Sequence, residues 1–256
     1  MLEFIRCFLA EFKKRKRSLF LVLHLIVPLS LSGALIVYML GRSDTLSAAA
    51  SYKIFFELIG VGTPVIIAII CGMVADSEGD AGNFQNMIGR TRSKIVTFIS
   101  QISMMLVSYW FAILLTITIY VFGIQYMVGI EGIDFTVFLW AGLIFSLTVV
   151  FQYFFYHMIA YKHGVGITSI FGFAGLIIAA LAMTTIGDNI WPYLPWAWGD
   201  RFIEQLIVIP QLNGIVISDQ FNLVVRGSIT AFLLTTMIIL WSMVWFNRWS
   251  NRKTID

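Results

Sequence analysis

The stretch IFFELIGVGTPVIIAIICGMVA, residues 54–75, decides the fold class of this chain. It carries one charged residue, Glu57, near its start, and its other residues are apolar or small. A helix needs roughly 20 apolar residues to cross the hydrocarbon core of a bilayer, which is about 30 Å thick. The stretch is therefore long enough to be a transmembrane helix, and its predicted solvent is lipid.

Similar stretches lie on both sides of it. The full set of predicted transmembrane helices is 18–40, 54–75, 95–123, 135–160, 165–187 and 227–246. Composition agrees, because 59% of the residues are hydrophobic and only 12% are charged, whereas soluble domains carry about 25% charged residues. The runs are continuous rather than short and alternating, which excludes a β-barrel pattern. We predict an all-α integral membrane protein with six transmembrane helices, and residues 1–256 form a single polytopic membrane domain.

The basic residues indicate which loops face the cytoplasm, where Lys and Arg accumulate. Of the 17 basic residues, 13 fall on the side that holds both predicted termini, and Arg42, Lys53, Arg201 and Arg226 fall on the other. Eight acidic residues share that second side, so its formal charge is near −4 and that of the first side is near +7. Both termini are predicted to be cytoplasmic. The acidic outer face reflects a shortage of Lys and Arg, or it attracts a cationic ligand.

Residues 1–17 are predicted to form an amphipathic interface helix. Apolar residues recur at helical spacing from Leu2 to Phe12, and five basic residues follow at Lys13–Arg17. Such a segment lies in the membrane interface and binds anionic headgroups, or it is a generic membrane anchor. The apolar run that follows is longer than a signal-peptide core, so we expect the chain to retain it.

Small residues lie on one face of the span 165–187. They are Thr168, Gly172, Gly175, Ala179 and Ala182, spaced by three or four residues. Small side chains let two membrane helices approach closely. We predict a helix-packing face here, and its partner is either a helix of the same chain or one of another subunit.

The external segment 188–226 is rich in aromatic residues, and Trp and Tyr favour the membrane interface. It opens with Ile190-Trp-Pro-Tyr-Leu-Pro-Trp-Ala-Trp198. We predict that it lies on the outer leaflet or dips shallowly into it. The residues proposed to face a ligand are Trp191, Tyr193, Trp196, Trp198, Asp200 and Glu204.

The sequence offers little for catalysis or for proton relay. His24 and His157 are the only histidines inside predicted spans, and a lone membrane histidine is usually a packing or hydrogen-bonding residue. No clustered bases or metal ligands are visible, and Gly-Lys, which a phosphate-binding loop needs, does not occur. We expect no catalytic residue, no cofactor or metal on this chain, and no nucleic-acid partner.

The cytoplasmic loop 76–94, DSEGDAGNFQNMIGRTRSK, has acidic residues at its start and basic residues at its end. That order suits a short helix by the helix dipole. Phe84, Met87 and Ile88 would form a small apolar face. The loop is therefore either a short amphipathic helix that docks into a partner's groove or a solvated connector.

Glu78-Gly-Asp-Ala-Gly82 resembles the E-x-x-x-G segment that follows the second helix of ABC-2 type permeases. Gly82-Asn-Phe-Gln85, the chain length and the segment Pro-Tyr-Leu-Pro-Trp-Ala-Trp at 192–198 are more closely similar to the lantibiotic-immunity permeases. The loop departs from many ABC-2 members in its tail, where Gly89-Arg-Thr-Arg92 replaces a Pro-containing pattern.

The resemblance implies a coupling segment that contacts a separate ATPase. Its residues here would be Glu78, Gly82, Asn83, Phe84, Gln85, Met87 and Ile88. It also implies a second permease subunit, ATP and Mg²⁺ on the partner ATPase, and a place in the bacterial cell membrane. Immunity members expel a cationic, membrane-active lantibiotic and so protect the producer. Alternatives are an ABC-2 permease for a drug or a lipid, and a membrane sensor or scaffold that transports nothing.

Overall fold

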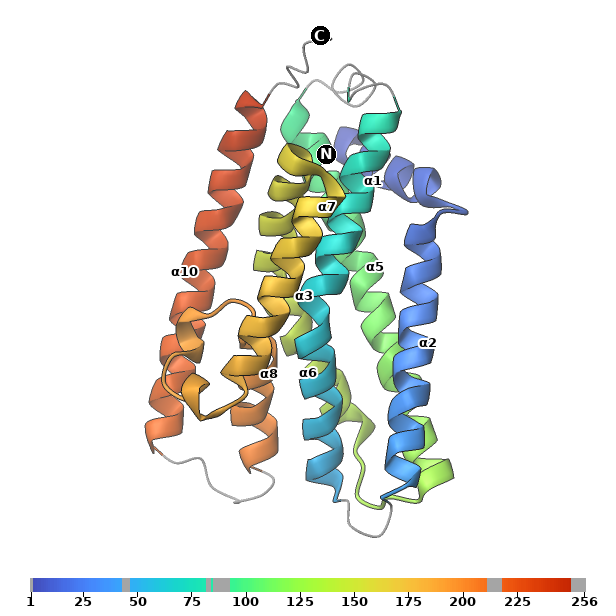
Figure 1. Ribbon diagram of the computed structural model, residues 1–256, viewed down its shortest axis with the longest axis vertical. Coiled ribbons are helices and arrows are strands. Elements are labelled where there is room, and N and C mark those ends of the chain that lie inside the picture. Colours follow the sequence, from blue (N-terminus) through green and yellow to red (C-terminus); the bar gives the residue numbers. More distant parts are fainter. Residues whose placement is uncertain (1, 43–46, 82–83, 85–92, 211–217, 250–256) are drawn as a thin grey trace.

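A computed structural model describes residues 2–42, 47–81, 84, 93–210 and 218–249, with residues 218–220 described in their backbone only. These residues form an elongated bundle of helices (Figure 1) and contain no strand. In chain order the helices are α1 (Leu2–Arg15), α2 (Leu19–Leu40), α3 (Ala48–Asp80), α5 (Lys94–Gly123), α6 (Phe135–Thr148), α7 (Val150–Ala182), α8 (Trp198–Ile203) and α10 (Ser218–Arg248). Shorter helical turns are η2 (Ile124–Val128), η3 (Thr185–Gly187), η4 (Trp191–Tyr193) and η5 (Glu204–Val208).

Five helical stretches of the described chain are long and apolar enough to cross a bilayer. They are Leu19–Leu40, Ala48–Asp80, Lys94–Val128, Phe135–Ala182 and Phe221–Arg248. The chain is therefore a multi-pass membrane protein, as predicted. One 48-residue stretch, Phe135–Ala182, contains the predicted span 135–160 and most of the predicted span 165–187. The count of six crossings therefore stays a prediction.

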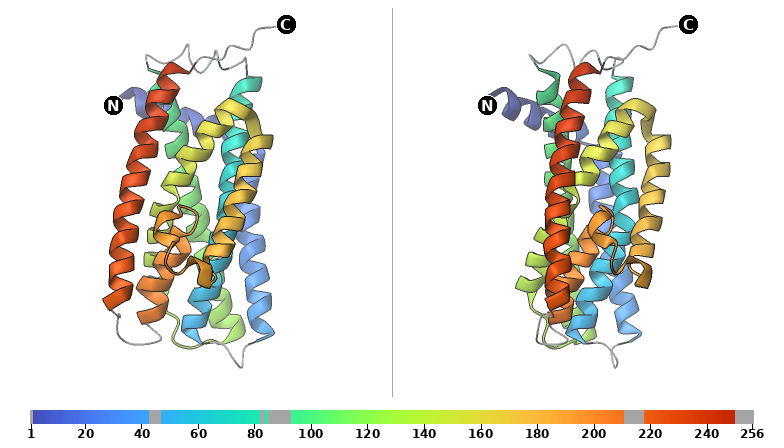
Figure 2. Two further views of the ribbon diagram at one scale, coloured as in Figure 1. Left: turned by 60° about the vertical axis from the view of Figure 1, so that its left-hand side comes forward. Right: turned by 90° about the vertical axis from the view of Figure 1, so that its left-hand side faces the viewer.

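The chain reverses direction inside α7, at Gly164. Tyr156 Oη donates a hydrogen bond of 3.3 Å to the carbonyl oxygen of Phe171, although residues 15 apart in a straight helix lie about 22 Å apart. Gly164 has φ 78° and ψ −179°, a conformation open mainly to glycine. Asp76 of α3 accepts a hydrogen bond from the backbone nitrogen of Val165 at 3.3 Å. Residues 150–163 and 165–182 are therefore two antiparallel arms, which meet at the bundle end near α1 (Figure 2).

Helix α3 is longer than the predicted span 54–75. It begins at Ala48, where the Ser47 hydroxyl accepts a hydrogen bond from the nitrogen of Ala50 at 3.2 Å, and it continues to Asp80. A helix of 33 residues is about 50 Å long, against a hydrocarbon core of about 30 Å. The first residues assigned to the cytoplasmic loop thus belong to the last turns of α3, which extend beyond the hydrocarbon core.

The spans differ in how much of them the bundle encloses. The most apolar 18 residues of α3 are 61% buried, and those of α10 are only 6% buried.

Helix α1 lies crosswise at the end of the bundle that also holds the C-terminal end of α10 (Figure 2). We call this the α1 end and the opposite one the far end. The exposed apolar residues of α1 include Leu2, Ile5, Leu9 and Phe12.

Candidate functional site

An ionic junction joins α1 to the last turns of α3. Arg15 Nη2 lies 3.1 Å from Glu78 Oε1, and Lys14 Nζ lies 2.9 Å from the same oxygen. Glu11, one turn earlier in α1, lies 2.6 Å from Lys14 and 3.6 Å from Arg15. Glu11, Arg15 and Glu78 are only 2%, 7% and 5% exposed. Buried charges this close fix the geometry of the junction, because removing one partner strands the other.

Arg15 also binds the backbone and a hydroxyl of α3. Its Nη2 donates to the carbonyl oxygen of Val74 at 3.4 Å, and its Nη1 donates to Ser77 Oγ. The carboxylates of Asp76, Glu78 and Asp80 lie at the C-terminal end of α3, where negative charge opposes the helix dipole. The cations of α1 compensate for that placement, which explains why the helix can continue past Ala75.

Burial and neighbouring charges shift the pKa values of Glu11 and Lys14 in opposite directions. Desolvation raises the pKa of Glu11 above its ordinary value, and the hydrogen bond and charge of Lys14 lower it only in part. Desolvation alone would lower the pKa of Lys14, but hydrogen bonds and charges of Glu11 and Glu78 outweigh it and raise that pKa. Lys14 therefore stays charged and bridges two carboxylates, which would otherwise repel each other.

Phe84 connects the same turn of α3 to the C-terminal end of α10. Its backbone nitrogen donates to the carbonyl oxygen of Glu78 at 3.2 Å, and its φ of 66° is unusual for a bulky residue. The ring centroid lies 5.5 Å from that of Tyr161 and 5.1 Å from that of Trp249. Lys94 Nζ, at the start of α5, donates to the carbonyl oxygen of Trp249 at 3.0 Å.

An aromatic and polar cluster lies deeper in the bundle, beneath Phe84. Tyr161 Oη donates to Gln101 Oε1 at 2.5 Å, and His157 Nε2 lies 3.1 Å from the same oxygen. Phe98 stacks on His157 with ring centroids 5.2 Å apart, and Phe246 of α10 stacks on Phe98 at 4.5 Å. The prediction that His157 is an interhelical hydrogen-bonding residue is confirmed. The cluster ties α5, α7 and α10 together at the α1 end.

Two of the predicted coupling residues, Glu78 and Phe84, are thus brought into one site. The other five, Gly82, Asn83, Gln85, Met87 and Ile88, lie outside the described residues. Their predicted helix is therefore not tested. The coupling role of the whole set stays a prediction.

The predicted helix-packing face is buried in the bundle. Thr168, Gly172, Gly175, Ala179 and Ala182 are all enclosed. A Cβ added to Gly172 would meet Ala68 and the backbone of α3, and one added to Gly175 would meet Tyr156 and Trp196. The neighbours of this face include α3 and the external segment of the same chain, a point that the sequence left open.

Part of the external segment packs into the bundle, whereas its position at the outer leaflet stays a prediction. Trp191 and Trp198 are fully buried, whereas Tyr193 is 60% exposed and Trp196 is half-buried. Trp196 Nε1 donates to Tyr156 Oη at 2.7 Å. Trp198 packs edge-on against Phe151 and Trp191 against Phe202, with ring centroids 5.7 Å and 5.1 Å apart. The segment η4–α8–η5 folds back along the far half of the bundle (Figure 1).

Arg201 and Asp200, adjacent in α8, have opposite surroundings. Arg201 is 4% exposed and fully bonded, to the carbonyl oxygen of Ala182 at 2.8 Å, to Asp188 at 2.9 Å and to Glu204 at 2.8 Å. Asp200 is 2% exposed, and within the described chain neither carboxyl oxygen has a hydrogen-bond partner. The site therefore contains one saturated cation and one unpaired acid.

The carboxyl group of Asp200 lies directly against Gly60 of α3, at a place where an added Cβ would collide with it. Desolvation, reinforced by the charges of Glu57 and Glu204, holds the pKa of Asp200 well above its ordinary range, although Arg201 lowers it in part. Burial and a raised pKa both disfavour an anionic Asp200 that would attract a cationic ligand at the surface. Tyr193 is exposed, whereas Glu204 is 19% exposed and already bonded to Arg201. The role of the predicted group in ligand binding stays a prediction.

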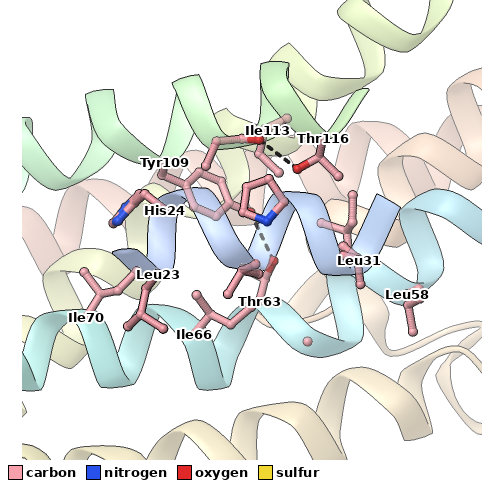
Figure 3. A pocket seen from close by; sticks show the side chains of 15 residues that line it. Leu23, His24, Leu31, Leu58, Thr63, Ile66, Ile70, Tyr109, Ile113 and Thr116 are labelled. Atoms are coloured by element: carbon pink, nitrogen blue, oxygen red, sulfur yellow. Dashed lines mark hydrogen bonds between the residues drawn. The ribbon is translucent and has the colours of Figure 1, made fainter. Parts of the chain in front are cut away.

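A small cavity lies between α2, α3 and α5 (Figure 3). Its volume is about 70 Å³, and most of its walls are apolar. Thr63 and Tyr109 form a hydrogen-bonded hydroxyl pair of 3.0 Å across it. Pro28 and Gly62 line it from α2 and α3.

Sequence reasoning also missed the partner of Glu78. The basic run at Lys13–Arg17 was interpreted as a headgroup-binding patch, yet Lys14 and Arg15 point into the protein. The spacing of Glu11 to Lys14 and Arg15, three and four residues, could have signalled an ion-paired helix face. Nothing in the sequence could have placed that face against α3.

Comparison with known proteins gives one match. Residues 7–175 match the family model described as ABC-2 family transporter protein. No curated protein and no solved structure matches the chain. The matched range contains the ionic junction, the turn of Glu78 and both arms of α7 as far as Gly175.

Proposed function

The chain belongs to the ABC-2 family of transporter proteins, and on that premise we propose that it is the permease subunit of an ATP-driven exporter. Members of this family are the transmembrane component rather than the ATPase. ATP and Mg²⁺ would therefore bind a separate partner chain, and a second permease subunit would complete the pore. ATP binding on a separate chain agrees with this sequence, because the Gly-Lys pair that a phosphate-binding loop needs does not occur in it.

We propose six crossings with both termini in the cytoplasm. The reversal at Gly164 divides the longest apolar stretch into two antiparallel arms, which supports the sixth crossing. The basic residues support the orientation, since 13 of the 17 fall on the α1 side. In this orientation the turn of Glu78 faces the cytoplasm, where an ATPase can reach it.

The observation that carries the proposal is the double attachment of the Glu78 turn. Its side chain is ion-paired with α1, and its carbonyl oxygen accepts the backbone hydrogen bond of Phe84. Phe84 in turn packs on α7 and on Trp249 beyond α10. An ATPase that pushes the coupling segment would therefore move α1, α3 and α10 together.

For the substrate we propose a cationic, membrane-active peptide, with a lantibiotic as the leading candidate. Export of such a peptide would protect the producing cell from its own product. The acidic formal charge of the outer loops, near −4, and the exposed ring of Tyr193 support a cationic ligand. A drug or a lipid is the alternative cargo, and a sensor or scaffold is the alternative class.

The coupling role is tested with Glu78→Ala and Phe84→Ala in the complex purified with its ATPase. We expect each variant to lower permease-stimulated ATP hydrolysis or the yield of assembled complex. Glu131→Ala and Phe122→Ala are matched controls, since both residues are exposed and lie near the far end. Normal coupling in both test variants would refute the assignment. If no P-loop ATPase co-purifies with the chain, the result favours the alternative of a sensor or scaffold that transports nothing.

The substrate is tested in a producer strain that lacks this gene. We expect greater sensitivity to the strain's own peptide, and restoration by the wild-type gene but not by Glu78→Ala. Unchanged sensitivity would rule out the peptide while leaving the transporter assignment intact. A panel of drugs and lipids would then be the next set of substrates to assay.

A further inference from the structure

A second hollow, distinct from the cavity in Figure 3, runs along the outside of the bundle between α1, α2 and α5. Its volume is about 270 Å³, and its surface is almost entirely apolar. Phe12 and Arg15 line it from α1, Phe20 and Leu21 from α2, and Phe111 and Leu115 from α5. It is open on one side, so in a membrane its natural filling is hydrocarbon rather than water.

Unpaired positive charge flanks this groove. Lys16 and Arg17 directly follow Arg15 in the turn between α1 and α2, and both are exposed. In the part of the chain that the structure describes, no ion pair is found for either of them. Arg17 has φ 69°, so the turn is sharp and holds the two cations beside the start of α2. Anionic lipid headgroups are attracted by such juxtamembrane basic residues.

We propose that this groove binds one anionic phospholipid from the leaflet on the α1 side. One acyl chain lies along Phe20, Phe111 and Leu115, and the phosphate lies against Lys16 and Arg17. A zwitterionic lipid could fill the apolar part equally well, but it would not neutralise the two cations. The preference for a net negative headgroup is therefore the specific content of the proposal, and it does not depend on which substrate the protein carries.

The position of Arg15 gives the bound lipid a second consequence. Arg15 forms part of the groove wall and also holds Glu78 at 3.1 Å. A lipid that packs on the stem of Arg15 restricts the rotamers of this long side chain. The occupied groove is therefore expected to stabilise the junction between α1 and α3.

The test is native mass spectrometry of the full-length protein in detergent, titrated with dioleoyl phosphatidylglycerol or dioleoyl phosphatidylcholine. The wild-type protein is expected to bind one phosphatidylglycerol more tightly than phosphatidylcholine. The double variant Lys16→Gln/Arg17→Gln is expected to lose about thirtyfold in affinity for phosphatidylglycerol alone, the contribution of two basic residues. Arg42→Gln/Lys53→Gln, the same change of charge near the far end, is the matched control.

A second variant tests the apolar part of the site. Ala112 lines the groove from α5, so Ala112→Phe is expected to fill it and to weaken binding of both lipids. Ile229→Phe, on the exposed face of α10, is the control for an added ring. Thermal unfolding of each variant without lipid shows whether that variant is folded. If Ala112→Phe does not fold, the double variant Lys16→Gln/Arg17→Gln still tests the proposal.

Three results that concern the headgroup would overturn the proposal. They are equal affinity of the wild type for the two lipids, unchanged binding in Lys16→Gln/Arg17→Gln, and displacement of the lipid by millimolar inorganic phosphate. The last would identify a phosphate site without an acyl groove. Unchanged binding in a folded Ala112→Phe would place the lipid elsewhere on the protein.

Discussion

The two ends of the bundle use buried charge in opposite ways. At the α1 end, Arg15 and Glu78 are 63 residues apart in sequence, and their pairing holds together two helices. At the far half, the bonds that Arg201 makes among the described residues all go to positions within 19 of itself, and the neighbouring Asp200 lies against α3 with no hydrogen-bond partner among those residues. The first arrangement links two elements, because Arg15 and Glu78 belong to different helices. The second stiffens one segment locally.

The largest expected effect is at the α1 end, from Arg15→Ala. Removing the guanidinium leaves Glu78 and Glu11 buried with less compensation, so we expect a loss of about 3–5 kcal/mol of stability and a fall in Tm of roughly 6–20 °C. Thermal unfolding in detergent measures it. Lys13→Ala, an exposed position on the same helix, is the control. Equal losses of stability in Arg15→Ala and Lys13→Ala would show that the ion pairs of the junction do not stabilise the fold.

The next effect concerns the unpaired acid at the far half. Because the folded-state pKa of Asp200 is raised above its ordinary value of 3.8, the unfolded chain releases this proton first as the pH rises. Stability that is present at acidic pH is therefore lost as the pH rises above about 4, by up to roughly 1.4 kcal/mol per unit until the folded-state pKa is passed.

Asp200→Asn removes this titration while keeping the shape of the side chain. We expect the variant to match the wild type near pH 4 and to be more stable at pH 7, measured as unfolding midpoints across that range. A pH-independent difference would contradict a neutral, buried Asp200.

The smallest expected effect comes from Gly60→Ala. The added methyl group would collide with the carboxyl of Asp200, and overpacking of this kind costs about 1–3 kcal/mol. Gly62→Ala, two residues along α3, has open space around the new atom and is the matched control. If both substitutions have the same effect on the unfolding midpoint, α8 does not pack against α3 as described.

The same contrast separates what the sequence predicts from what it cannot. Apolar run length placed the spans well, because lipid imposes a length and a composition on every crossing. The turn at Gly164 was also foreseeable, between two apolar runs that meet at Lys162, His163 and Gly164. These features depend on residues that are neighbours in the chain.

The failures depend on contacts between distant residues. Asp76 and Glu78 were assigned to a loop, since their charge signals the end of a span, yet Arg15 and the nitrogen of Val165 keep them in α3. The aromatic run from Trp191 to Trp198 has the composition of a membrane interface, and only the fold shows that two of its indoles are buried. A local sequence pattern shows neither the residues that bind the end of α3 nor those that cover the two indoles.

The reversal at Gly164 bears on how the protein is made. A hairpin that turns at a single residue has a short tip, with Lys162 and His163 as its exposed polar residues. We therefore expect residues 150–182 to enter the membrane as one paired unit rather than as two successive helices. Lys162 is then the single fixed positive charge at its tip, and it would govern which way the hairpin faces during synthesis. Lys162→Glu should scramble the side on which a reporter fused after Ala182 appears, whereas an unchanged reporter side would show that the flanking helices decide orientation.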